Sequence, residues 1–352
     1  MKATAEERSQ CALAEARRQI ESGLIQGCVM ATNADGIIGA VGNQCVHPAP
    51  VPMSAASRFD IASCGKTFTA ACVALLSLEG KIDLDAPFTE YLPEHCLGKS
   101  CPITVRDLAM HVSGFDNSKP YSSSDPEAFL KGIYDKRPVW PRQTHYEYAC
   151  SNFIMLGFIA EHVTGKPLEA IARERIWQPL AMTHTCWSEP GSGPHEVEHW
   201  FPNRPAGVHN DEECRKAGQP IGSGSCFSTA GDLLLFVQDI ITQDCFPQSY
   251  YDLITTCRFD RESVRRAFCW DMTAGRRPRN LSEQAIFHTG WTGQTLLADP
   301  GTGFAAVVLT SRTGDWTEAC EGRARIIEKL YGGTMADDDH LGARDNNHLP
   351  MF

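Results

Sequence analysis

The residues Ser63 and Lys66 have the types and the spacing that nucleophilic chemistry needs. They lie near the start of a helix that apolar periodicity predicts over 59–79, and residues three apart share one helix face. A buried lysine can lose its proton far below its ordinary pKa of about 10.4 and help to deprotonate a neighbouring serine. The pair therefore predicts an activated nucleophile for acyl transfer. A serine N-cap followed by a helical lysine is the simpler alternative.

Two later segments hold residues that would complete such a site. Tyr148 lies in an aromatic stretch, and a tyrosine hydroxyl near a lysine can act as a general base when its phenolate is stabilised. His288, Thr289 and Gly290 end a predicted strand, where a glycine lets a ligand approach the backbone closely. A backbone N–H at that point can complete an oxyanion hole. Taken singly, the tyrosine segment is better explained by a core aromatic, and the histidine segment also fits a strand edge that runs into a tight turn.

The elements that must position these residues predict an α+β fold. Helical patterns cover 5–22, 59–79, 153–163, 229–241 and 316–331, and strand patterns cover 28–33, 36–41, 284–288, 294–299 and 305–310. The strands come from both ends of the chain, so we expect an antiparallel β-sheet flanked by helices, formed by both termini, with an inserted all-helical lobe. The sheet lobe would be 1–60 and 220–352, and the helical lobe 61–219, with the active site in the cleft between them. The segment 184–222 is rich in Pro and Gly and predicts a long surface excursion.

Composition excludes several classes of function. The net charge of −11 disfavours nucleic acid as a partner, and no apolar run is long enough for a membrane span. The 15 cysteines include no Cys-x-x-Cys pair, which disfavours a structural zinc site. The first residues lead into a charged stretch and not an apolar signal region, so we expect a reducing, cytoplasmic location. His195 and His199 have metal-ligand spacing, but no third ligand is evident and we expect no metal.

In order and separation, Ser63-x-x-Lys66, Tyr148 and His288-Thr-Gly290 resemble the motifs of the serine β-lactamase and penicillin-binding-protein superfamily. The similarity runs from about residue 27 to residue 312 and is greatest to the class C branch, with its D-alanyl-D-alanine carboxypeptidases, family VIII esterases and related acyltransferases. It also includes the segments 103–114, 208–211, 226–232, 298–300 and 309–312.

The resemblance implies a β-lactamase/transpeptidase-like fold and roles for particular residues. Ser63 would attack a carbonyl, while Lys66 and Tyr148 manage the proton, with Tyr148 the favoured base. The backbone N–H groups of Ser63 and Trp291 would form the oxyanion hole. His288 would orient either the substrate or Tyr148, and no cofactor is implied.

The sequence departs from the family pattern at residues that contact substrate. Cys150 occupies the place of the asparagine in the family's Tyr-x-Asn motif, and a thiol is only a weak hydrogen-bonding group. Asn152 comes two residues late. His288 replaces the usual lysine and is mostly neutral at pH 7. We expect Cys150, Asn152, Thr289 and Gly290 to contact substrate.

Both departures favour an ester or thioester donor over a β-lactam or peptide. The sequence therefore predicts a serine hydrolase that acts on a small-molecule ester or thioester through an acyl-Ser63 intermediate. A biosynthetic acyltransferase, transesterase or cyclase that uses the same acyl-enzyme is the main alternative. A β-lactamase, a peptidase or a non-catalytic scaffold is less favoured, and the oligomeric state is not predicted.

Overall fold

A six-stranded antiparallel sheet joins the two ends of the chain. The computed structural model describes residues 3–118, 125–188, 206–261 and 263–332. The strand order is β3-β2-β1-β10-β9-β8, so the first and the last strands of the chain meet at the β1–β10 pair in the middle of the sheet. The strands are β1 (Ile25–Thr32), β2 (Gly36–Cys45), β3 (Val51–Pro52), β8 (Ile286–Gly290), β9 (Gln294–Asp299) and β10 (Phe304–Arg312).

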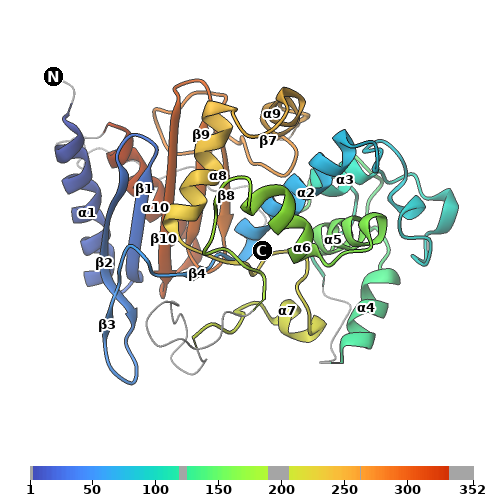
Figure 1. The fold of residues 1–352 in the computed structure, drawn as a ribbon, viewed down its shortest axis with the longest axis horizontal. Helices are drawn as coiled ribbons and strands as arrows, with labels where there is room; N and C mark the ends of the chain where they lie inside the picture. The colour runs from blue at the N-terminus through green and yellow to red at the C-terminus, as the bar shows by residue number, and fades with distance from the viewer. Residues whose placement is uncertain (1–2, 119–124, 189–205, 262, 333–352) are drawn as a thin grey trace.

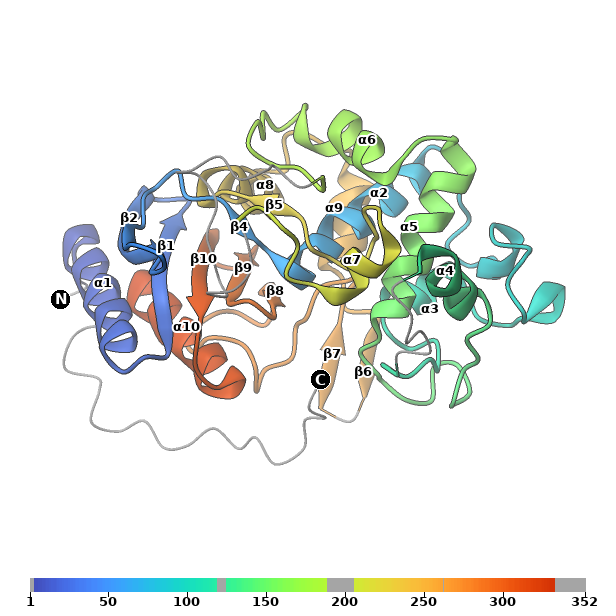
Figure 2. The same ribbon diagram turned by 90° about the horizontal axis from the view of Figure 1, so that it is seen from below.

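Helices cover both faces of this sheet. Helices α1 (Ala5–Glu21) and α10 (Trp316–Tyr331) lie together on one face, and α8 (Ala230–Thr242) lies on the other (Figures 1 and 2). Side chains of a strand alternate between the two faces. Accordingly Met30 and Val308 join the core under α1 and α10, whereas Val29 and Val307 join the core that contains α8. The fold class expected from the sequence is confirmed.

A group of helices packs beside the sheet and holds the central part of the chain (Figure 1). The α-helices are α2 (Lys66–Leu78), α3 (Val105–Ala109), α4 (Pro126–Tyr134), α5 (Cys150–Thr164), α6 (Leu168–Ala172), α7 (Glu212–Ala217) and α9 (Gln248–Thr255). Three short 3₁₀ helices cover Ala62–Gly65, Phe88–Glu90 and Gly98–Ser100, and Arg173–Trp177 is a π-helical turn. Two small ladders pair β4 (Phe59–Asp60) with β5 (Phe227–Ser228) and β6 (Phe259–Arg261) with β7 (Val264–Arg266).

The expected single helix over 59–79 is wrong at its start. Its first residues form β4 and then a 3₁₀ turn that contains Ser63, and the α-helix begins only at Lys66. Ala62, directly before the serine, has a left-handed φ of 46°. This conformation costs a residue with a side chain about 1–3 kcal/mol, and such strain is typical of functional sites. Periodicity missed the turn because most of the residues on both sides of Ser63 are buried, which masks the change of backbone conformation.

Candidate active site

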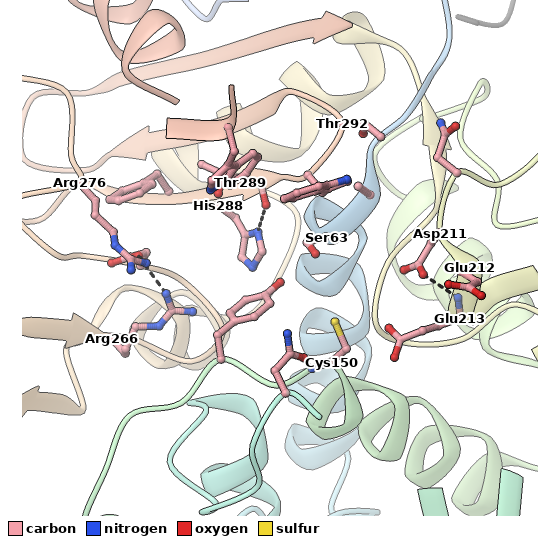
Figure 3. A pocket seen from close by; sticks show the side chains of 18 of the residues that line it. Ser63, Cys150, Asp211, Glu212, Glu213, Arg266, Arg276, His288, Thr289 and Thr292 are labelled. Atoms are coloured by element: carbon pink, nitrogen blue, oxygen red, sulfur yellow. Dashed lines mark hydrogen bonds and ion pairs between the residues drawn. The ribbon is translucent and has the colours of Figure 1, made fainter. Parts of the chain in front are cut away.

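A pocket of about 520 Å³ opens around Ser63, where the 3₁₀ turn, strand β8 and the segment before α5 meet (Figure 3). Ser63, Tyr148, Cys150, His288, Thr289 and Trp291 all line it. Three segments far apart in the sequence therefore bring six of the expected site residues to one cavity. Lys66, Asn152 and Gly290 are not among the residues that line it.

Lys66 is fully buried beside the serine and contacts three acceptors. Its Nζ donates to Ser63 Oγ at 3.0 Å, to Cys150 Sγ at 3.6 Å and to the backbone oxygen of Ser223. The hydroxyl of Tyr148 is a further hydrogen-bond partner of Lys66, so polar groups surround the amino group.

The pKa values of this cluster correct one expectation. Burial lowers the pKa of Lys66. Cys150 and Tyr148 beside it raise that pKa by more than burial lowers it, so the net shift is upward. This upward shift is opposite in direction to the expected loss of the lysine proton, because the sequence did not reveal the polar groups around Nζ.

Tyr148 completes the cluster as a neutral phenol. Burial raises the pKa of Tyr148 to about 12, although the charge of Lys66 and hydrogen bonds to Lys66 and Ser63 act in the opposite direction. The Lys66 ammonium lies 5.0 Å from the centre of the tyrosine ring. The hydroxyl of Tyr148 is thus bonded to both the nucleophile and a permanent cation, which stabilises negative charge as it develops on the phenol oxygen.

Strand β8 forms the wall opposite Tyr148 and carries His288. The Nδ1 atom of His288 lies 3.0 Å from the backbone oxygen of Thr289 (Figure 3). A carbonyl oxygen can only accept, so Nδ1 holds the proton and Nε2 is the acceptor. Burial, followed by the charges of Arg266 and Lys66, lowers the pKa of His288 well below its ordinary value. His288 is therefore a neutral hydrogen-bonding group and not a substitute for a lysine cation.

Gly290 acts through packing and not through contact with a ligand. A Cβ at this position would lie 2.5 Å from the backbone oxygen of Ile61. Its lack of a side chain allows β8 to press against the turn that carries Ser63, and a bond from Cys64 Sγ to the backbone oxygen of His288 joins the same two segments. The expectation that Gly290 contacts substrate is corrected: the close approach it allows is that of the protein's own backbone.

The two expected oxyanion-hole residues lie on the two segments that Gly290 brings together. Ser63 is on the turn, and Trp291 directly follows β8. The Trp291 side chain is 47% exposed and stacks on Trp316 at 5.4 Å, with the Arg312 guanidinium 4.3 Å from its ring. Both indoles line the pocket and form an aromatic part of its rim.

Cys150 and Asn152 have different locations. Cys150 begins α5 and faces the pocket beside Lys66 (Figure 3). Asn152 is fully buried, where its amide contacts Ser113 and His111. The expectation that Asn152 binds substrate is wrong, because two residues along a helix rotate a side chain by about 200° and turn it away from the pocket.

Sequence reasoning missed the backbone of the segment 222–226. The Ser223 carbonyl accepts from Lys66, and Gly224, with a φ of 146°, lies so close to the nucleophile turn that a Cβ would be 2.5 Å from the Ala62 oxygen. The pattern Gly222-Ser-Gly224 was the available signal, but it lay at the end of a segment interpreted as a surface excursion. Residues 206–222 instead include α7 and part of the pocket wall.

The second feature missed is the charge at the two ends of the pocket. Arg266 and Arg276 lie on one side of Ser63, and Asp211, Glu212 and Glu213 lie on the other (Figure 3). Apart from Asp211, which ends the segment 208–211, these residues belong to no segment that resembles the family. They meet only because β7, the segment after it and the start of α7 converge on the cavity.

The cationic end is built for an acceptor group. Arg266 is 2% exposed, and its Nη1 and that of Arg276 lie 3.2 Å and 3.5 Å from the same Asp271 oxygen. Two guanidinium groups and one carboxylate leave a net positive charge. Arg266 Nε and the Tyr146 hydroxyl are buried without a hydrogen-bond partner among the described residues. Unpaired buried donors beside excess positive charge are suited to an anionic group of a ligand.

The expectations about a metal site and a membrane span can be compared with the structure only within the residues that it describes. Within the described ranges no cluster of three or more His, Cys, Asp or Glu side chains suits a metal ion. His195 and His199 lie outside those ranges. In the part of the chain that the structure describes, no helix is both long and apolar enough to cross a membrane.

The fold and the site together are those of an enzyme class that uses a serine for acyl transfer. The sequence model of the beta-lactamase family matches residues 35–331, and the chain belongs to that family.

Several known proteins are similar to this chain. A putative D-alanyl-D-alanine carboxypeptidase of Escherichia coli O157:H7 is 24% identical over an alignment of 309 residues that covers 75% of this chain and 71% of the relative. Among solved structures, EstCE1, described as a hydrolase with promiscuous acyltransferase activity, has a TM-score of 0.77 at 17% identity and covers 93% of this chain and 99% of its own. A class C beta-lactamase has a TM-score of 0.77 at 18% identity and covers 92% and 95%. At these identities the structural matches establish the fold alone.

Proposed function

We propose that this protein is a serine hydrolase that cleaves an ester or thioester bond of a small molecule through an acyl-Ser63 intermediate. The observation that carries the proposal is the cluster of Ser63, Lys66 and Tyr148 at one pocket, with Lys66 Nζ 3.0 Å from Ser63 Oγ. Because the lysine is charged and the phenol is neutral, Tyr148 is the residue that relays the proton.

The first half-reaction needs no ionised base in the resting state. Ser63 Oγ bonds to the carbonyl carbon while its proton moves to the Tyr148 oxygen, and the Tyr148 proton passes to the leaving oxygen or sulfur as the bond from that atom to the carbonyl carbon breaks. The Lys66 ammonium stabilises the negative charge on the phenol oxygen during this exchange. The N–H groups of Ser63 and Trp291 would bind the carbonyl oxygen as it becomes negative. In the second half-reaction a water oxygen bonds to the acyl carbon and gives one proton to the Tyr148 oxygen. The proton already on Tyr148 passes to Ser63 Oγ as the ester bond to Ser63 breaks, which releases the acid and restores both side chains.

The positive charge at the Arg266 end of the pocket favours substrates that carry an anionic group. A small ester or thioester with a carboxylate or a similar anion would pair with Arg266, Arg276 and the hydroxyl of Tyr146. This arrangement supplies the cation that His288 does not, although from another part of the fold. The loss of a lysine in the third motif is therefore no argument against an anionic substrate.

Two other functions have specific support. Transfer of the acyl group to an alcohol or amine uses the same intermediate, and the structural similarity to EstCE1 favours it as the main alternative. A carboxypeptidase is favoured by the arginine pair and by the names of the curated relatives. Cys150 opposes it, because a thiol is a poor partner for a substrate amide.

Intact-mass measurement tests the proposal most directly. The protein is incubated with a fluorophosphonate, with p-nitrophenyl acetate and hemisuccinate esters, with an acyl thioester, with a D-alanyl-D-alanine peptide and with nitrocefin. We expect one adduct with the fluorophosphonate and faster turnover of the esters than of the peptide or nitrocefin. Addition of an alcohol acceptor then distinguishes hydrolysis from transfer. No fluorophosphonate adduct on Ser63 would contradict the proposed nucleophile.

A further inference from the structure

Three buried polar side chains form a chain of hydrogen bonds behind Tyr148. Ser113 and His111 are 1% exposed and Asn152 is fully buried. The Ser113 hydroxyl donates to Asn152 Oδ1 at 2.7 Å, and the amide nitrogen of Asn152 lies 3.2 Å from His111 Nδ1. The family motifs place these residues near the site, but none of the three lines the pocket.

The direction of these bonds follows from the donors. The backbone N–H of Ala149 points to His111 Nδ1 at 3.2 Å, and a backbone N–H can only donate. Nδ1 is therefore an acceptor, and the neutral ring holds its proton on Nε2. Because Nδ1 is an acceptor, the end of the Asn152 amide that faces it is the NH₂ group, and Oδ1 accepts from the Ser113 hydroxyl. The Ala149 N–H thus sets the tautomer of His111, and His111 and Ser113 hold the two ends of the Asn152 amide.

His111 holds the chain on both sides of Tyr148. Its backbone oxygen accepts from the N–H of Glu147 at 3.0 Å, and its ring accepts from the N–H of Ala149. The same ring lies on the Tyr148 ring, with centroids 4.5 Å apart and planes 31° apart. The backbone on each side of the tyrosine and the plane of its ring are thus fixed by one residue.

The surroundings keep His111 neutral, which this arrangement requires. Burial is the main reason that the pKa of His111 is well below its ordinary value, and the charges of Arg266 and Lys66 lower it further. Tyr146 packs against the ring edge at 6.2 Å. A proton on Nδ1 would break the bonds to both Asn152 and Ala149.

We propose that His111, oriented by Asn152 and Ser113, is a positioning residue that places the Tyr148 hydroxyl between Ser63 and Lys66. The inference rests on the proposed proton transfer through Tyr148. It assigns a role to the His111-Val-Ser-Gly114 segment and to Asn152, which the chemical steps leave unused. Errors of about 1 Å in such placement can lower a rate about 100-fold.

A pair of substitutions at His111 separates its acceptor from its ring. His111→Asn keeps an acceptor near the Nδ1 position, whereas His111→Phe keeps a ring against Tyr148 but accepts nothing. With p-nitrophenyl acetate we expect His111→Phe to lower kcat about 10- to 100-fold with KM changed less than about threefold, and His111→Asn to retain kcat within about fivefold. A folded His111→Phe protein, checked by thermal unfolding, with wild-type kcat would overturn the proposal.

A matched pair of serines keeps the test valid if the histidine variants fail to fold. Ser113→Ala removes the hydroxyl that orients Asn152, and we expect kcat to fall about three- to tenfold with KM unchanged. Ser151→Ala removes a similarly buried hydroxyl on α5 that lies outside the chain of bonds, and we expect a change of less than about twofold. Equal kcat values for these two variants would contradict the proposal.

Tyr148→Phe distinguishes failure of this inference from failure of the proposed function. If Tyr148→Phe is inactive while both His111 variants retain full kcat, only the positioning role is wrong. If Tyr148→Phe retains full kcat, the proposed proton transfer itself is wrong, and the positioning role fails with it.

Discussion

The reacting side of the pocket and its charged ends are built in different ways. Ser63, Lys66 and Tyr148 come from two short segments, and their contacts are with buried side chains and backbone. The charged ends come from β7, the loop after it and the start of α7, and they include the exposed Glu212. The comparison teaches that the chemistry of this site depends on local spacing, whereas its substrate preference depends on how distant segments meet.

The largest effect is expected at the nucleophile. Ser63→Ala removes the only atom that forms the acyl-enzyme, and kcat should fall about a millionfold, as it does when one member of a catalytic unit is lost. Turnover of p-nitrophenyl acetate measures this, with thermal unfolding as the control for folding. More than a tenth of wild-type activity would show that another residue attacks the carbonyl.

Tyr148→Phe should have the next largest effect. It deletes the hydroxyl that relays the proton and removes little volume, so we expect kcat to fall about 10³- to 10⁴-fold. Lys66→Met serves as the comparison, measured with the same ester. A mild Tyr148 variant beside an inactive Lys66 variant would reverse the assignment and make the lysine the base.

The same contrast explains how much of the molecule the sequence predicted. The strands β8, β9 and β10 and the helix α10 were predicted nearly to their ends, because they alternate or repeat regularly between polar turns. Ser63, Lys66 and Tyr148 lie together as expected, because a spacing of three residues and a family motif can both be recognised in a single sequence. The pKa direction of Lys66 and the packing of Gly290 could not be predicted, because each depends on a distant contact, such as that of Lys66 with Cys150 at a separation of 84. Asn152 is turned away from the pocket by its place on α5 and contacts His111 instead.

Cys150 lies at the border between the two regions and should decide between substrate classes. A β-lactam has a side-chain amide, and leaving a buried amide without a partner costs about 1–3 kcal/mol, or about ten- to a hundredfold in rate. Cys150→Asn should therefore raise the turnover of nitrocefin by about that factor and leave aryl ester turnover within about threefold. Steady-state kinetics with both substrates measure this. Nitrocefin turnover by the wild type that equals its best ester would contradict the interpretation of Cys150.

The arginine end should affect binding more than chemistry. Arg276→Gln removes one of two guanidinium groups, and a charge-assisted hydrogen bond is worth about 1.5–3 kcal/mol. We expect KM for a p-nitrophenyl hemisuccinate ester to rise about tenfold, with kcat nearly constant and the neutral acetate ester unaffected. Equal changes for the two esters would show that the substitution disturbs the pocket in general and that this end does not recognise an anion.

The smallest effect is expected from a change of pH near neutrality, because the pKa of His288 lies below the usual range for a histidine. A histidine with its ordinary pKa of about 6.5 would be half protonated at pH 6.5, and protonation would remove the Nε2 acceptor from the pocket. In the folded protein burial and two nearby cations lower that pKa well below this value, so Nε2 stays unprotonated as the pH falls from 8 to 6. Activity that depends on the neutral ring is then lost only at lower pH. We expect kcat/KM for the neutral ester to change less than about twofold across this interval in both the wild type and His288→Gln. A tenfold loss centred at pH 6.5 in the wild type alone would mean that His288 titrates there, and that the cationic surroundings of β8 act on its charge far less than their positions in the structure imply.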